Sequence, residues 1–200
     1  MAKKRTTRKP KEPKTKTTTE STEELEVLES AYVLMGPIES ENCKDAIEWI
    51  LGMNSLPLQE APTLLTLYVI SPGGHLHPAI ALVDIMRGSR IPIRTIGLGQ
   101  IASAGLIIFM AGHKGLRQLT EYTSVMSHQY AADGGAGKHH EIMASVKEHQ
   151  MTHEKLISIY QKFSGMKRKV ITDTLMSHSD FFMTAQEAKD YGICDYVGPL

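Results

Sequence analysis

The sequence predicts an α/β fold with a mostly parallel sheet, and three observations support that prediction. Continuous apolar and β-branched runs recur along the chain, as in strands that are buried on both faces, and the clearest run spans 64–70. Segments whose apolar residues repeat every three or four positions separate these runs, which is typical of helices. The connections are short, so we expect parallel pairing through right-handed crossovers.

The first half of the chain alternates strands and helices. Strands are predicted over 31–35, 64–70 and 91–98, and helices over 42–51, from Leu76 to the Gly88-Ser89 pair, and in the apolar run from Leu106. Gly36-Pro37 ends the first strand and Ser71-Pro72-Gly73-Gly74 ends the second. The two glycines permit positive φ and close backbone approach, so their N–H groups could face a ligand.

The second half begins with two short strands within 116–126 and continues into a long helix over 140–163 that Gly165 closes. The middle of this helix, Lys147–His153, is polar on every side. A helix with so little apolar surface is expected to project from the globule and pack on another subunit. A short helix over 170–176, a helix opened by a capping box at Thr184, and a strand over 193–197 complete the pattern.

Composition separates a basic tail from one folded domain. Residues 1–19 hold eight Lys or Arg against one Glu and no apolar periodicity, so residues 1–22 are predicted to be disordered and 23–200 to form one domain. The rest of the chain has 14 basic and 21 acidic residues, a net charge of −7. A tether to an acidic surface or to nucleic acid would fit such a tail, but a solubilising extension is the favoured interpretation. Nucleic acid is not expected as a partner, because no aromatic residue is interleaved with the charges.

The sequence also bounds the compartment. No stretch is long and apolar enough to span a bilayer, and the N-terminus lacks the apolar core of a secretion signal, so we expect a soluble protein without a membrane partner. Two cysteines, Cys43 and Cys194, form neither a metal spacing nor a disulfide framework, which indicates a reducing compartment. The expected location is the cytoplasm, with a plastid or an infected host's cytoplasm as the alternative.

Two polar residues follow predicted strands. Ser103 lies where the strand over 91–98 gives way to an apolar helix, and its small neighbours leave its Oγ unshielded, as nucleophile turns require. A helix N-cap is the simpler interpretation of this serine. His128 follows another strand, and side chains beyond the carboxyl ends of parallel strands can meet at one edge of the sheet. These residues therefore form a candidate nucleophile and base.

An ordered set of motifs connects the chain to a known family. The motifs are SPGG at 71–74, ASAG at 102–105, AGHKG at 111–115, VMSHQ at 125–129 and FMTAQEAKDYGICD at 182–195. In this order they resemble ClpP, the family of Clp protease proteolytic subunits, over about residues 32–197. The resemblance implies a ClpP/crotonase-type fold of repeated β-β-α units with a projecting handle at about 129–165.

The resemblance also implies an activity and partners. The chain is expected to be a serine endopeptidase that hydrolyses peptides or unfolded proteins inside a chamber of heptameric rings, which can stack to a tetradecamer. An unfoldase of the AAA+ Clp type would feed it. No cofactor is expected on this chain, because ATP would be used by the unfoldase.

Site residues follow from the positions that match. Ser103 would be the nucleophile, His128 the general base and Asp180 the carboxylate that orients the histidine, with the Gly74 and Ala104 N–H groups as oxyanion donors. About three extra residues between His128 and Asp180 leave Asp173 as a competitor. The substrate groove is expected to include Gly73, His75, Gly134 and Gly135.

Other interpretations remain open. His178-Ser179 replaces an acidic and basic pair that is usual in the family, which leaves room for an inactive or partner-activated ring subunit. A crotonase-like acyl-CoA enzyme would share the paired-glycine logic but needs no Ser-His pair. His149 and His153 stand four residues apart, a spacing that can hold a metal, but a solvated helix face is the favoured interpretation and no metal is expected.

Overall fold

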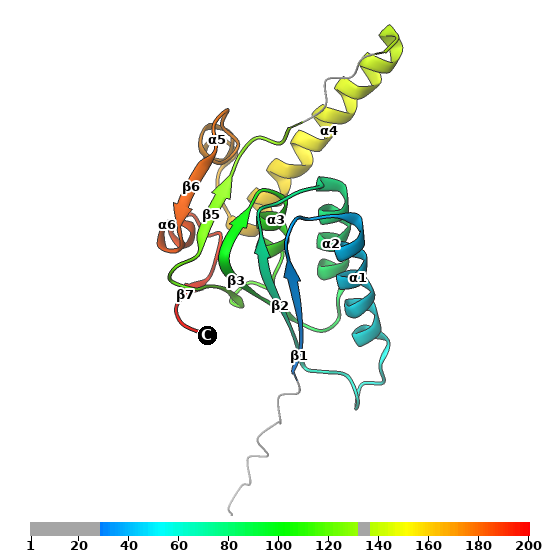
Figure 1. Ribbon diagram of the computed structural model, residues 1–200, viewed down its shortest axis with the longest axis vertical. Coiled ribbons are helices and arrows are strands. Elements are labelled where there is room, and N and C mark those ends of the chain that lie inside the picture. The colour runs from blue at the N-terminus through cyan, green and yellow to red at the C-terminus, as the bar shows by residue number, and fades with distance from the viewer. Residues whose placement is uncertain (1–28, 132–136) are drawn as a thin grey trace, which may run out of the picture.

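The computed structural model describes residues 29–131 and 137–200, which form a seven-stranded sheet with helices packed on it (Figure 1). The strands are β1 (Glu29–Met35), β2 (Leu64–Ser71), β3 (Ile93–Ala102), β4 (Arg117–Leu119), β5 (Ser124–Ser127), β6 (Phe181–Thr184) and β7 (Tyr196–Val197). The helices are α1 (Ser40–Ser55), α2 (Leu76–Gly88), α3 (Ala104–Met110), α4 (His139–Ser164), α5 (Arg168–Val170), the π-helical η1 (Ile171–Leu175) and α6 (Ala185–Asp190).

The sheet is mostly parallel, as predicted. Its order is β1-β2-β3-β4-β7, and β5 pairs with the second half of β3. The start of β3 pairs with β4 at Thr95–Gly97, and its end pairs with β5 at Gln100–Ala102. The strand therefore runs beyond the predicted 91–98, bending at Gly99, whose φ is +62°. This long strand carries the chain directly to Ser103.

Helices α1 and α2 lie side by side along β1 and β2, and α3 lies between them and the base of α4 (Figure 1). All seven residues of α3 are buried, which is why its sequence is apolar throughout rather than amphipathic. The core combines this helix with the inward side chains of β2, α1 and α2. These are chiefly Leu65, Leu67, Val69, Ala46, Ile50, Leu82 and Met86.

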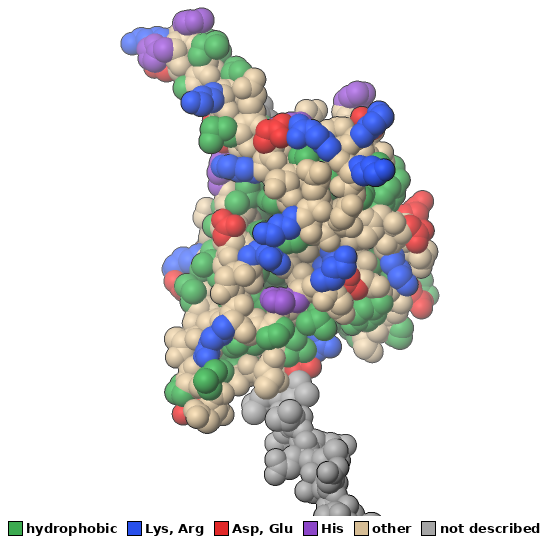
Figure 2. All heavy atoms as spheres, turned by 180° about the vertical axis from the view of Figure 1, so that it is seen from behind, with side chains coloured by type: hydrophobic (Ala, Val, Ile, Leu, Met, Phe, Trp, Pro, Cys, Tyr) green, Lys and Arg blue, Asp and Glu red, His purple; other side chains and the backbone are tan. Residues whose placement is uncertain are grey.

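Helix α4 projects from the body, as its polar middle predicted (Figure 1). Its C-terminal half is anchored in the core by Leu156, Ile157, Tyr160 and Phe163, and Gly165 closes it in the left-handed conformation, with φ +79°. Figure 2 shows Lys or Arg and histidine side chains at its free end. Its outer half exposes the apolar residues Ile142, Met143, Val146 and Met151.

Three elements differ from the sequence-based expectation. The segment before the Thr184 capping box forms β6, antiparallel to β5, which no local pattern indicated. The helix predicted over 170–176 is the π-helical η1, directly preceded by the short α5, and the last strand contains only Tyr196–Val197. Short strands owe their existence to the partner strand rather than to their own sequence. The capping box itself is confirmed, because Thr184 Oγ1 accepts a hydrogen bond from the Glu187 N–H at 3.2 Å.

Some expectations fall outside the described residues. The basic tail over 1–22 and the glycines Gly134 and Gly135 belong to this group. Among residues 29–131 and 137–200, no helix combines the length and the apolar character needed to cross a lipid bilayer.

Candidate active site

The turn between β3 and α3 is the most constrained point of the backbone. Ser103 has φ +52° and ψ −120°, and it is the one non-glycine residue with positive φ in the described chain. Such a conformation costs about 1–3 kcal/mol and persists only where the surroundings enforce it. Here the Ser103 N–H donates to the Met126 carbonyl of β5 at 3.0 Å. The strain presents Oγ outward at the carboxyl end of the sheet, as in a nucleophile elbow.

Glycines allow the neighbouring segments to approach this turn. A Cβ on Gly73 would lie 2.6 Å from Ser103 Cβ and 2.9 Å from the Ala102 carbonyl oxygen. A Cβ on Gly105 would lie 2.8 Å from Ser71 Cβ at the end of β2. The SPGG and ASAG motifs thus meet in one close contact, in which a side chain on Gly73 would collide with Ser103 and one on Gly105 with Ser71.

His128 joins Ser103 to a carboxylate. It follows β5 directly, and its Nε2 lies 2.8 Å from Ser103 Oγ while its Nδ1 lies 3.1 Å from Asp180 Oδ1. The imidazole is 30% exposed and the carboxylate 54%, so solvent reaches both groups. The arrangement is that of a nucleophile, a base and an orienting acid connected in line.

Strand β6 explains how Asp180 reaches the histidine. In the antiparallel β5–β6 pair, Ser127 stands opposite Phe181, so the residues one step further out, His128 and Asp180, are neighbours. Asp173, the competitor in the sequence, instead forms an ion pair with Lys169 on α5. The carboxylate that contacts His128 is therefore that of Asp180.

The predicted oxyanion donors flank the serine. Ile38 N–H donates to the Gly73 carbonyl, and the His75 N–H donates to the Ile38 carbonyl, both at 2.8 Å, which fixes the glycine loop from one side. Within the residues that the structure describes, the N–H groups of Gly74 and Ala104 have no hydrogen-bond acceptor. Both residues line the same cavity as Ser103, so a developing oxyanion there could accept from both.

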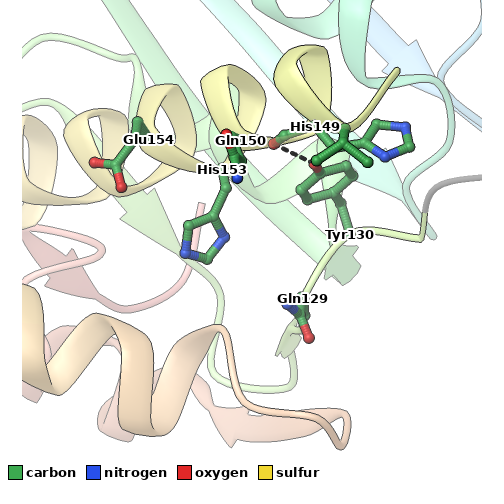
Figure 3. Close-up of a pocket in the computed structure, with 7 residues that line it drawn as sticks. Gln129, Tyr130, His149, Gln150, His153 and Glu154 are labelled. Atoms are coloured by element: carbon green, nitrogen blue, oxygen red, sulfur yellow. Dashed lines mark hydrogen bonds between the residues drawn. The ribbon is translucent and has the colours of Figure 1, made fainter. Parts of the chain in front are cut away.

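We call this hollow the nucleophile cavity; its volume is about 520 Å³. His75, Leu76 and His77 line it from the start of α2, and Glu148, His149 and Thr152 from α4. A second cavity of about 730 Å³ shares Tyr130 and His149 with it (Figure 3). Tyr130 lies against α4, where its hydroxyl donates to the His149 carbonyl at 2.6 Å.

The α4 wall is what sequence reasoning missed. The polar stretch 147–153 predicted only a helix that leaves the globule. Three of its residues, Glu148, His149 and Thr152, nevertheless line the nucleophile cavity. The available signal was that this stretch stays polar on every side, which also suits the wall of a polar cavity. His153, considered with His149 for a metal, points into the second cavity (Figure 3). No group of three His, Cys, Asp or Glu residues suited to a metal ion occurs in the described residues.

Known proteins resemble this chain over most of its length. A family model described as Clp protease matches residues 16–199. An ATP-dependent Clp protease proteolytic subunit of Deinococcus radiodurans is 30% identical over 174 residues, which cover 86% of this chain and 81% of that protein. The ATP-dependent Clp protease proteolytic subunit 1 of Bifidobacterium longum is 32% identical over 172 residues, covering 86% of this chain and 72% of that protein.

Proposed function

The chain belongs to the Clp protease family and is a serine-type peptidase, and we propose that Ser103, His128 and Asp180 carry out its chemistry. The single observation behind this proposal is the unbroken contact from Ser103 Oγ through both His128 nitrogens to Asp180. The unmatched N–H groups of Gly74 and Ala104 beside it support the same chemistry.

In the proposed reaction, Ser103 Oγ attacks the peptide carbonyl carbon as His128 Nε2 takes its proton. The carbonyl oxygen becomes an oxyanion that the Gly74 and Ala104 N–H groups stabilise. Collapse of this intermediate breaks the C–N bond, and the proton passes from His128 to the leaving amine. Water then attacks the acyl-serine by the same route, which releases the acid and restores Ser103. Asp180 keeps the proton on Nδ1, so that Nε2 is free to act as the base.

We further propose that the chain acts in a ring-shaped homo-oligomer that an ATP-dependent unfoldase supplies with unfolded protein. Both relatives are named as proteolytic subunits of ATP-dependent proteases. The exposed apolar residues on the outer half of α4, Ile142, Met143 and Val146 among them, support packing against another subunit. This chain would contribute the hydrolytic site and no cofactor, and ATP would be consumed by the unfoldase.

The direct test compares wild type with Ser103→Ala on a short fluorogenic peptide, alongside a mass measurement of the assembly. We expect the variant to assemble normally and to lose about 10⁴-fold or more in rate, because a triad acts as a unit. Ser55→Ala, at an exposed serine on α1, is the matched control and should keep wild-type activity.

A fluorophosphonate that labels nucleophilic serines separates the alternatives. Labelling of wild type but not of Ser103→Ala would support an active peptidase. Wild-type turnover by Ser103→Ala would refute the nucleophile. Rings that form without labelling or turnover would indicate a subunit that a partner must activate. The His178-Ser179 pair, which replaces the pair usual in the family, is the reason for considering this alternative.

A further inference from the structure

One wall of the nucleophile cavity carries an acidic side chain that the proposed triad does not use. Glu148 lines the cavity from α4, next to His149 and Thr152, and its side chain is 49% exposed. Ligand cavities are usually lined by apolar groups with a few polar groups that set orientation and specificity. A carboxylate in the space next to the nucleophile is therefore a candidate for specificity.

The Glu148 carboxylate has a defined orientation. Thr152, one turn further along α4, is buried, and its hydroxyl donates to Glu148 Oε1 at 2.8 Å. This hydrogen bond holds the pKa of Glu148 below its ordinary value, so the group is ionised at neutral pH. The wall of the cavity thus carries a negative charge that the Thr152 hydroxyl helps to orient.

Among the residues that the structure describes, the basic side chains near this charge are histidines. His77 Nε2 lies 3.4 Å from Glu148 Oε1, and His149 Nε2 lies 3.8 Å from Oε2. Within the described part of the chain, no Lys or Arg pairs with Glu148, whereas Glu154 on the same helix forms a bidentate pair with Arg168. At neutral pH, Glu148 therefore retains capacity for a cation supplied from outside the chain.

We infer that Glu148 makes this peptidase select substrates with Lys or Arg at the residue whose carbonyl Ser103 attacks. The inference rests on the proposed function. Ser103, Gly74, Ala104 and Glu148 line one cavity, so a substrate carbonyl held at Ser103 would bring the adjoining side chain into the same space as Glu148. A long basic side chain can there donate charge-assisted hydrogen bonds to the Glu148 carboxylate. An acidic side chain would meet like charge, so selection against Glu and Asp follows from the same residue.

The test uses peptides that differ only at this residue, with Arg, citrulline, Leu or Glu. Citrulline has the shape of Arg without its charge, so the Arg to citrulline ratio of kcat/KM isolates the electrostatic contribution. For the full-length assembled protein we expect a ratio of about tenfold or more. Glu148→Gln should reduce the ratio to near one. Glu154→Gln, the same change on the same helix outside the nucleophile cavity, should keep the wild-type ratio.

A second readout does not depend on short peptides. Mass spectrometry of an unfolded protein digested by wild type should show cleavage enriched after Lys and Arg, and Thr152→Val, which removes the hydroxyl that orients Glu148, should weaken that enrichment. Equal cleavage after Leu and Arg, or a ratio that Glu154→Gln lowers as much as Glu148→Gln, would overturn the inference.

The inference and the proposed function fail in different ways. Hydrolysis that depends on Ser103 but ignores the charge of the substrate overturns the inference alone. If every peptide stays intact and Ser103 is not labelled, the proposed function and the inference fall together.

Discussion

The polar groups at the two ends of β3 differ in how completely they are hydrogen-bonded. At its carboxyl end, Ser103 is held in a strained conformation beside N–H groups that lack acceptors. At its amino end, in register with β4, Arg117 has every nitrogen satisfied: Nε and Nη2 donate to Asp195 at 3.0 and 2.6 Å, and Nη1 donates to the Phe163 carbonyl at 2.8 Å.

The difference separates function from stability within one sheet. Asp195 Oδ2 also accepts from the N–H groups of Gly115 and Arg117, so this ion pair ties β4, β7 and the end of α4 together. A satisfied network of this kind has no capacity left for a substrate. At the catalytic end the N–H groups of Gly74 and Ala104 stay free to bind a substrate. Interactions elsewhere in the structure must offset the backbone strain at Ser103.

The largest effect should come from disturbing the catalytic end. Asp180→Asn leaves the shape of the site but no longer favours the proton on His128 Nδ1, so we expect kcat to fall by about 10³–10⁴-fold with little change in stability. Steady-state kinetics on a fluorogenic peptide measures this. Asp173→Asn, whose carboxylate pairs with Lys169, is the matched control, and a comparable loss from it would contradict the assignment of Asp180.

The complementary change disturbs the Arg117–Asp195 ion pair at the amino end of β3. Asp195→Asn leaves the buried Arg117 guanidinium without a countercharge, so we expect the unfolding free energy to fall by about 3 kcal/mol, with the activity of the folded protein unchanged. Urea denaturation measures the loss. A variant as stable as wild type but catalytically impaired would show that the two ends are coupled after all.

The stability difference between wild type and Asp195→Asn depends on pH with a definite sign. Although burial alone would raise the pKa of Asp195, the Arg117 hydrogen bonds hold it below its ordinary value of 3.8. A lowered folded-state pKa contributes stability above the unfolded value, and that stability is lost as the pH falls through the folded-state pKa. Wild type and Asp195→Asn should therefore differ fully at neutral pH and converge only well below pH 3.8.

The smallest effect should come from a network beneath the catalytic end. Ser127, which precedes His128, donates to the Leu175 carbonyl at 2.6 Å and lies 2.7 Å from the Tyr160 hydroxyl. Burial raises the pKa of Tyr160 to about 12, so its hydroxyl keeps its proton. Because the one hydroxyl proton of Ser127 goes to the Leu175 carbonyl, Tyr160 is the donor in the contact between the two hydroxyls. Tyr160→Phe should lower the unfolding free energy by about 1 kcal/mol. Ser127→Ala should lower it by about 2 kcal/mol, because it leaves the buried Tyr160 hydroxyl without an acceptor. Thermal denaturation of both variants ranks them, and the reverse order would contradict this donor assignment.

Much of the catalytic end could be predicted from the sequence. The glycine pairs, the small residues around Ser103 and the strand before His128 are local signals, and the structure brings these two side chains to 2.8 Å. The projecting α4, its Gly165 cap and the Thr184 capping box were likewise predicted from short segments. In each case sterics and hydrogen bonds within a few residues determine the outcome, so local sequence is enough.

Tertiary structure decided the rest. Asp180 lies 52 residues from His128, and only the antiparallel register of β6 on β5 distinguished it from Asp173. Glu148 and Thr152 became part of the nucleophile cavity because α4 passes beside the start of α2. Arg117 and Asp195 stand 78 residues apart and meet only where β4 pairs with β7. Pairing of distant segments depends on how the whole core packs, and no short window of sequence contains that information.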